Sequence, residues 1–350
     1  MDHNWYRHLY LIGSPTSSWA VFIRVLVAVG APLIGAMLLG DPGAAVVAGF
    51  TALFVTLSDV GSNPVSRIGW MSGGLLTVIL GATLGHELGG TPYSREVVVV
   101  LCALTAGWAS GAHPGIAVVT RILAIAAVVA SSTHFSVGNG VILGALMGGA
   151  SALACAYAIW LVFGIPAADN VMDWRAGLRR ALSGEGSSAR FAVCYAGTTA
   201  VALFAASELH LHDAFWAAMV VLMVMRREGT ACIELTILYA VGTILGVTTG
   251  ALLLQLDWTV LGVATLASVV AAFTRIGFSL NPGLGFWAFT VFVILCAHLR
   301  MDAEATSQLL TTRLYDVAVG CLLALAGTLV ATYPRFSRAS VLLRRRLQQR

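Results

Sequence analysis

Long apolar segments with few charged residues follow one another along most of the chain. An α-helix of about 20 such residues crosses the hydrocarbon core of a bilayer. Twelve segments are candidates for helices of this kind. They lie at about 18–39, 43–58, 68–86, 96–111, 114–131 and 138–164, and at about 190–207, 213–226, 232–254, 258–274, 283–298 and 312–333. The runs are continuous rather than alternating, so they predict helices and not half-buried strands.

The composition excludes a water-soluble globule. Hydrophobic residues make up 58% of the 350 positions and charged residues only 10%, whereas a soluble domain carries about 25% charged residues. Such a chain lacks the polar surface that water requires. We therefore predict an all-α, polytopic transmembrane helical bundle of about 12 spans, with little mass outside the membrane.

The distribution of arginine predicts the orientation of the chain. All 20 basic residues are arginine. When the N-terminus is placed on the cytoplasmic side, fifteen arginines fall in cytoplasmic segments, and only Arg95 and Arg300 fall in outer loops. Cytoplasmic loops normally carry this excess of positive charge. We expect both termini to be cytoplasmic, an even number of spans, and a multi-pass protein of the bacterial inner membrane.

One hydrophilic stretch, residues 165–189, divides the chain. It reads as an amphipathic cytoplasmic bridge between a first transmembrane half, residues 1–164, and a second one, residues 190–334. The arginine-rich tail, residues 335–350, either marks topology or lies on anionic lipid. The bilayer is thus an expected partner of the protein.

The two halves resemble each other when the chain is shifted by 168 positions. The step His113–Gly115 then falls on Asn281–Gly283, and Gly74 falls on Gly242. Six helices per half is an even number, so both halves enter the membrane in the same direction. We predict two parallel six-helix repeats related by an axis along the membrane normal, an arrangement that favours a pathway between the halves.

Charged residues inside spans are costly in a bilayer and therefore mark candidate sites. Arg121 lies two helical turns beyond the Pro114–Gly115 step, and a guanidinium there can bind a carboxylate through two parallel hydrogen bonds. The alternative is an arginine that satisfies helix carbonyls or an acid. Arg313 and Asp316 are three positions apart, which allows an ion pair. Alternatively, Arg313 binds substrate and Asp316 couples transport to protons.

Two further titratable residues are candidates. Glu234 lies near the start of its helix, close to Arg226 and Arg227, where it either forms a salt bridge or couples to protons. His113 precedes a proline at a helix junction. It is either a satisfied structural group or a substrate-binding residue that changes charge near neutral pH.

The remaining motifs point to packing rather than chemistry. Gly242 and Gly246 are four positions apart on one helix face, which permits close helix approach, and Gly74 occupies the equivalent position in the first half. No phosphate-binding loop, nucleophile elbow or dinucleotide fingerprint occurs. The cysteines show no metal-binding spacing. We expect no enzyme activity, no catalytic residue, no metal, no cofactor and no nucleic-acid partner.

Three groups of residues resemble a known family. They are Phe215–Leu222, Gly242–Gly246 and Arg313–Gly320, with a fainter version of the second group in Ser72–Leu76. Together they resemble the fusaric acid resistance family of integral-membrane transporters, which includes bacterial aromatic acid exporters. An arginine commonly precedes the family's Gly-Thr step, and this chain has Tyr239 in that region.

The resemblance and the buried arginines together suggest a function. We expect a secondary transporter that exports small organic anions, in particular aromatic ones, driven by protons, and a homo-oligomer is compatible with this function. A passive organic-anion channel is one alternative, in which Glu234 and Asp316 would be dispensable. A non-transporting membrane assembly or envelope protein is another, in which all the charges would be structural.

Overall fold

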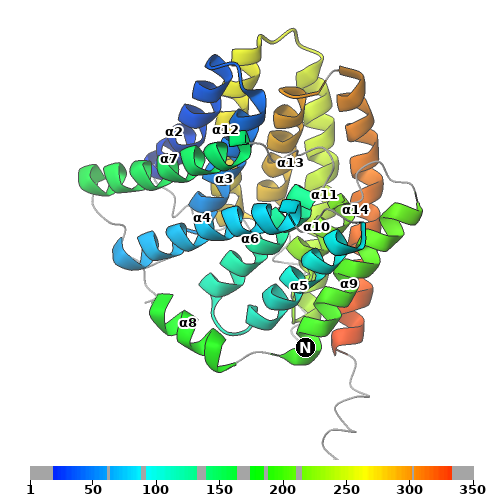
Figure 1. Cartoon of the computed structure of the whole chain (residues 1–350). Coiled ribbons are helices and arrows are strands. Elements are labelled where there is room, and N and C mark those ends of the chain that lie inside the picture. The colour runs from blue at the N-terminus through cyan, green and yellow to red at the C-terminus, as the bar shows by residue number, and fades with distance from the viewer. Residues whose placement is uncertain are drawn as a thin grey trace, which may run out of the picture.

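The computed structural model describes residues 19–60, 64–87, 92–131, 139–163, 174–184, 188–209, 215–301 and 303–332. All regular secondary structure in these ranges is helical (Figure 1), which confirms the predicted all-α class. The helices are α2 (Trp19–Leu38), α3 (Pro42–Leu57), α4 (Pro64–Glu87), α5 (Pro92–Ala109), α6 (Pro114–Ser131), α7 (Asn139–Phe163), α8 (Trp174–Ser183), α9 (Ala189–Glu208), α10 (Phe215–Val224), α11 (Gly229–Leu254), α12 (Val260–Leu280), α13 (Pro282–His298) and α14 (Ala303–Thr332). The arginine-rich tail, residues 335–350, lies outside the described residues.

Eight described helices are long and apolar enough to cross a membrane, which indicates a multi-pass membrane protein. They are α2, α4, α6, α7, α9, α11, α12 and α14. Four shorter apolar helices, α3, α5, α10 and α13, occupy the other predicted segments. Each of the twelve predicted segments thus coincides with a helix, and four of these helices fall below the spanning length.

Three of the four short helices, α3, α10 and α13, lie in the interior of the bundle. Nine of the ten residues of α10 are buried, and α3 and α13 are buried along most of their length. α3 and α13 each begin with proline, whose missing N–H costs nothing in a first turn. The Asp41 carboxylate accepts a hydrogen bond from the Ala44 N–H (2.9 Å), and the Asn281 side chain accepts one from the Gly283 N–H (2.7 Å). These caps fix where the two helices start.

The same helix pairs pack together in both halves. α4 packs on α6 as α11 packs on α13, and α3 packs on α7 as α10 packs on α14. A Cβ atom at Gly144 would meet the Ala44 carbonyl (2.6 Å), and one at Gly320 would meet the Ala217 carbonyl (2.7 Å). Between the halves, α5 packs on α9 and α12 packs on α2. In Figure 1, α4 and α7 run across the view, whereas α11 and α14 run up it.

Helix α8 lies within the predicted bridge, at the lower left of Figure 1. It carries three exposed arginines on one side. On the other side Gly177 is buried, and a Cβ atom there would meet the His113 ring (2.9 Å) and the Trp70 indole (3.2 Å). The bridge helix is therefore packed against the start of α6.

Candidate functional site

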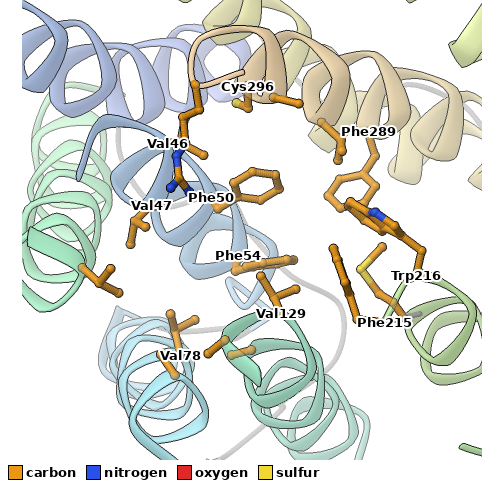
Figure 2. A pocket seen from close by; sticks show the side chains of 18 of the residues that line it. Val46, Val47, Phe50, Phe54, Val78, Val129, Phe215, Trp216, Phe289 and Cys296 are labelled. Carbon is orange, nitrogen blue, oxygen red and sulfur yellow. The ribbon is translucent and has the colours of Figure 1, made fainter. Parts of the chain in front are cut away.

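A central cavity of about 310 Å³ lies between the two halves. Its walls come from α3, α4, α6 and α7 of the first half and from α10, α13 and α14 of the second. Figure 2 shows five aromatic side chains around this space: Phe50, Phe54, Phe215, Trp216 and Phe289. Most of the other lining residues are valine, alanine and similar apolar groups. The cavity therefore suits a flat, apolar ligand.

The aromatic rings hold one another in place. Phe50 and Phe289, from different halves, form an edge-to-face pair with ring centroids 6.4 Å apart. Phe54 lies 6.4 Å from the same Phe289 ring. Phe215 and Trp216 form a tilted pair at 4.6 Å. Such pairs contribute about 0.5–1.5 kcal/mol each beyond their buried area, which stabilises this arrangement of the lining.

Trp216 and Arg300 carry polar groups in this apolar lining. The Trp216 indole N–H is buried and donates no hydrogen bond to a described residue. A buried donor without an acceptor is costly. Arg300, in the turn after α13, is the one charged side chain among the described residues that line the cavity. Burial lowers the pKa of the Arg300 guanidinium, and Asp41 opposes this effect.

Arg313 and Asp316 lie behind the Trp216 wall of the cavity. The Arg313 guanidinium stacks on the Trp216 ring, 3.6 Å from its centroid, and both charged residues are fully buried. Tyr239 on α11 lies within electrostatic range of both. Both residues thus lie near Tyr239 in one buried region, which the indole separates from the central cavity. Neither Arg313 nor Asp316 lines the cavity itself.

A second, polar cavity of about 650 Å³ lies at the other end of α10. Arg121 on α6 lines it together with Arg226 and Arg227, which follow α10. Glu228 is the one acidic residue among its described lining residues. Its remaining walls come from the end of α5 and the turn after it, from Phe191 and Tyr195 on α9, and from Met225 and Ala231. The predicted site residue Arg121 therefore faces a polar space.

Two arginines of the polar cavity, Arg121 and Arg226, lie within electrostatic range of each other. Arg226 donates a hydrogen bond to the Met225 carbonyl (3.0 Å). Burial lowers the pKa of Arg226 to about 9, and the neighbouring Arg121 contributes to the decrease. The Tyr195 hydroxyl donates to the Leu222 carbonyl (2.6 Å) and holds the end of α10 against α9. This cavity is thus lined by an excess of positive charge, which favours anions.

A third cluster of charged residues lies in the first half, where an internal carboxylate pairs with the arginines. Asp59, which follows α3, accepts hydrogen bonds from Arg24 on α2 and from Arg67 on α4. The Arg67 contact is bidentate, with Nε at 2.7 Å and Nη2 at 3.1 Å. Arg275 on α12 lies within electrostatic range of Asp59. Sequence reasoning missed this network, although an arginine within a predicted span and an acid at the same membrane side were both visible.

The other predicted site residues lie outside both cavities. His113 stacks on Trp70 with ring centroids 5.2 Å apart, and its Nδ1 accepts a hydrogen bond from the Gly115 N–H (3.1 Å). It thereby caps α6 as Asn281 caps α13. Glu234 is half-buried on α11, one turn beyond the cavity-lining Ala231.

The predicted packing glycines lie where no side chain fits. A Cβ atom at Gly242 would lie 2.6 Å from the Gly283 carbonyl, and one at Gly246 would lie 2.6 Å from Thr290 on α13. A Cβ atom at Gly74 would collide with Ser58. Within the described residues, no three His, Cys, Asp or Glu side chains gather in a metal-binding arrangement.

Comparison with known proteins supports the resemblance of the second half. Residues 200–327 match the family model described as fusaric acid resistance protein-like. This range runs from α9 into α14 and includes Trp216, Tyr239 and Arg313. The family predicted from the sequence is thereby confirmed for this segment. No curated protein and no solved structure matches the chain.

Proposed function

We propose that the protein is a secondary transporter that exports small organic anions with an aromatic ring, driven by protons. The central cavity carries this proposal. Its five aromatic side chains offer apolar faces to a ring, while the Arg300 guanidinium can donate to a carboxylate or sulfonate. The fusaric acid resistance-like family of residues 200–327 supports a role in membrane transport.

The arrangement of the two cavities supports a carrier. The central cavity and the polar cavity lie at opposite ends of α10. Between them, Val220, Val221, Leu222 and Val224 of α10 are fully buried. In this proposal α10 is the barrier between the cavities, and its movement opens the route. The matching helix pairs of the two halves support the arrangement as two parallel repeats, which in transporters places the site between the halves.

We assign the charged residues as follows. Arg121 attracts the anion into the polar cavity. Arg313 adds positive potential behind the Trp216 ring, and Asp316 provides a carboxylate that can take up a proton beside it. Glu234 is a second candidate for proton coupling, near the polar cavity. His113 stacks on Trp70 and caps α6, and it lines neither cavity, so we assign it no role in transport.

A transport assay tests the proposal. Purified protein is reconstituted into liposomes with a pH gradient, and uptake of benzenesulfonate is compared with that of cyclohexanesulfonate. Both ions stay charged and leak slowly through lipid, so uptake reports the protein. We expect uptake of the aromatic ion that exceeds protein-free liposomes and that collapses when a protonophore dissipates the gradient. Equal rates with and without the gradient would contradict proton coupling.

Replacing a ring of the cavity should change selectivity. The variant Phe289→Ala removes the ring that pairs with Phe50 and Phe54. We expect benzenesulfonate uptake to fall about tenfold, since an aromatic pair and its buried area contribute about 1–2 kcal/mol. Cyclohexanesulfonate, which cannot form such pairs, should be affected less. Phe204→Ala, which removes an exposed ring from α9, serves as the control. An equal loss for both ions would argue against recognition of the aromatic ring.

Topology reporters test the proposed orientation in the inner membrane. Fusions after residues 187 and 349 should both report the cytoplasmic side, because fifteen arginines lie in the segments assigned to that side. A fusion after Asp257, in the turn between α11 and α12, should report the opposite side. A periplasmic signal at either of the first two positions would overturn the arrangement of twelve spans.

A further inference from the structure

The two halves contain equivalent helix junctions, but one is filled by charged side chains and the other contains a cavity. In the first half, the segment after α3 meets α2, α4 and α12, and Asp59 lies at the centre with Arg24, Arg67 and Arg275 around it. In the second half, the segment after α10 meets α9, α11 and α5, and the same region is the polar cavity of about 650 Å³. One junction is thus closed by an ion network and the other is open.

The equivalence rests on the helix packing and on the sequence. Helix α2 packs on α3 and α12, and its counterpart α9 packs on α10 and α5. Asp59 and Arg227 are 168 positions apart, the same offset that relates Pro114 to Pro282. The second half therefore has a guanidinium at the position where the first half has its carboxylate.

This replacement leaves an excess of positive charge in the second junction. Arg121, Arg226 and Arg227 line the cavity, and Glu228 is the one acid among the described lining residues. Glu228 and Arg227 are both exposed, so water screens both charges, and the excess of buried positive charge lies on Arg121 and Arg226. The lowered pKa of Arg226 has the same origin, since burial and Arg121 both disfavour its charged form. Close arginines of this kind are stabilised when an anion binds between them.

We propose that the polar cavity is an anion-binding site in which the carboxylate of a ligand takes the place that Asp59 takes in the first half. The Arg67–Asp59 contact shows the expected mode, with two guanidinium nitrogens on one carboxylate. This proposal adds Arg226 and Arg227 to Arg121 as anion-binding residues. The inference rests on the proposed function in one respect, because it names the chemical group by which a transported anion is first recognised.

Reintroducing the internal carboxylate tests the site. The variant Arg227→Asp gives the second junction the residue of the first. The probe is acetate, which has a carboxylate but no ring to occupy the central cavity, compared with chloride and inorganic phosphate at equal ionic strength. The thermal unfolding midpoint of the purified full chain in detergent is measured against probe concentration.

For the unmodified protein, we expect acetate to raise the midpoint by a few degrees relative to chloride and to saturate. Arg227→Asp should show at least a tenfold weaker response to acetate. Its midpoint without acetate should exceed that of the unmodified protein, because the new carboxylate relieves the repulsion among the arginines. Arg179→Gln, which removes an exposed arginine of α8, should respond as the unmodified protein does.

A second variant distinguishes a loss of anion binding from a folding defect. Arg226→Gln removes one arginine without adding an acid, and it should also weaken the acetate response at least tenfold, with Arg226→Lys between this variant and the unmodified protein. An unchanged acetate response in Arg227→Asp would overturn the proposal, as would a response of the unmodified protein to phosphate alone. These measurements need no gradient, so a failure of transport and a failure of binding are observed separately.

Discussion

Replacing Asp59 by asparagine is expected to lower the free energy of unfolding by about 3–5 kcal/mol. Asparagine has the same size but no charge, so Arg24 and Arg67 would lose the carboxylate that both of them contact. Arg24 is only 3% exposed and cannot recover the loss from water. The thermal unfolding midpoint of the purified protein, followed by tryptophan fluorescence, measures the effect.

Asp41→Asn is the matched control for this variant. The Asp41 carboxylate caps α3 by accepting from the Ala44 N–H, and asparagine caps helices about as well as aspartate. The same chemical change should therefore cost less than about 1 kcal/mol at this position. Equal shifts for the two variants would show that the Asp59 network contributes no special stability.

The contribution of Asp59 should depend on pH in a defined direction. Burial raises the pKa of its carboxyl, but Arg24 and Arg67 outweigh burial, so the pKa lies below the usual 3.8. A group whose pKa is lower in the folded state stabilises the fold above its unfolded pKa, about 3.9, and loses this effect as the pH falls through its folded value. The difference in unfolding free energy between the unmodified protein and Asp59→Asn should therefore be constant above about pH 5 and shrink below about pH 4.

The positions of the helices could be predicted well from the sequence, for physical reasons. A helix inside a bilayer must satisfy its own backbone and present apolar side chains on all sides, so uninterrupted apolar runs locate it without knowledge of its neighbours. The two Pro-Gly steps at Pro114 and Pro282 located the starts of α6 and α13, because proline is tolerated in a first turn. The lengths of the short helices were less predictable, since the ends of α10 depend on what surrounds them.

The candidate sites were less accessible to sequence reasoning. Phe50 and Phe289 lie 6.4 Å apart between their ring centroids but come from different halves, and in an apolar sequence neither differs from a lipid-facing phenylalanine. Charge was the better signal, because a buried charge demands a partner. It singled out Arg121, Arg313 and Asp316. It did not reveal that Arg24 pairs with Asp59, since that contact depends on how α2, α3 and α4 pack.

Replacing Arg121 by glutamine is expected to lower the initial rate of anion transport at least about tenfold. A charged hydrogen bond to a ligand contributes about 1.5–3 kcal/mol, and Arg121 lines the polar cavity with Arg226 and Arg227. Its Nε atom is buried without a hydrogen-bond partner among the described residues. Benzenesulfonate uptake into liposomes, at equal amounts of reconstituted protein, measures the effect.

The thermal stability of Arg121→Gln should not fall with its transport rate. This difference distinguishes the proposed role of Arg121 from a structural one. Arg121 repels Arg226 and helps to lower the pKa of that guanidinium. Without Arg121 this repulsion is gone, so the thermal midpoint of Arg121→Gln should stay the same or rise. Arg121→Lys should recover part of the transport, because it keeps the charge but not the planar fork that binds a carboxylate or sulfonate through two hydrogen bonds.

Arg190→Gln provides the control for the transport measurement. Arg190 donates a hydrogen bond to the Val330 carbonyl (2.7 Å) and lines neither cavity, so its loss should leave the rate within about twofold, as expected for a substitution away from the site. If Arg121→Gln transports the anion at the unmodified rate, Arg121 is a structural arginine and the anion enters by another route. If it loses transport together with thermal stability, the Arg121 cation stabilises the fold, and repulsion among the arginines of the polar cavity is not what its removal relieves.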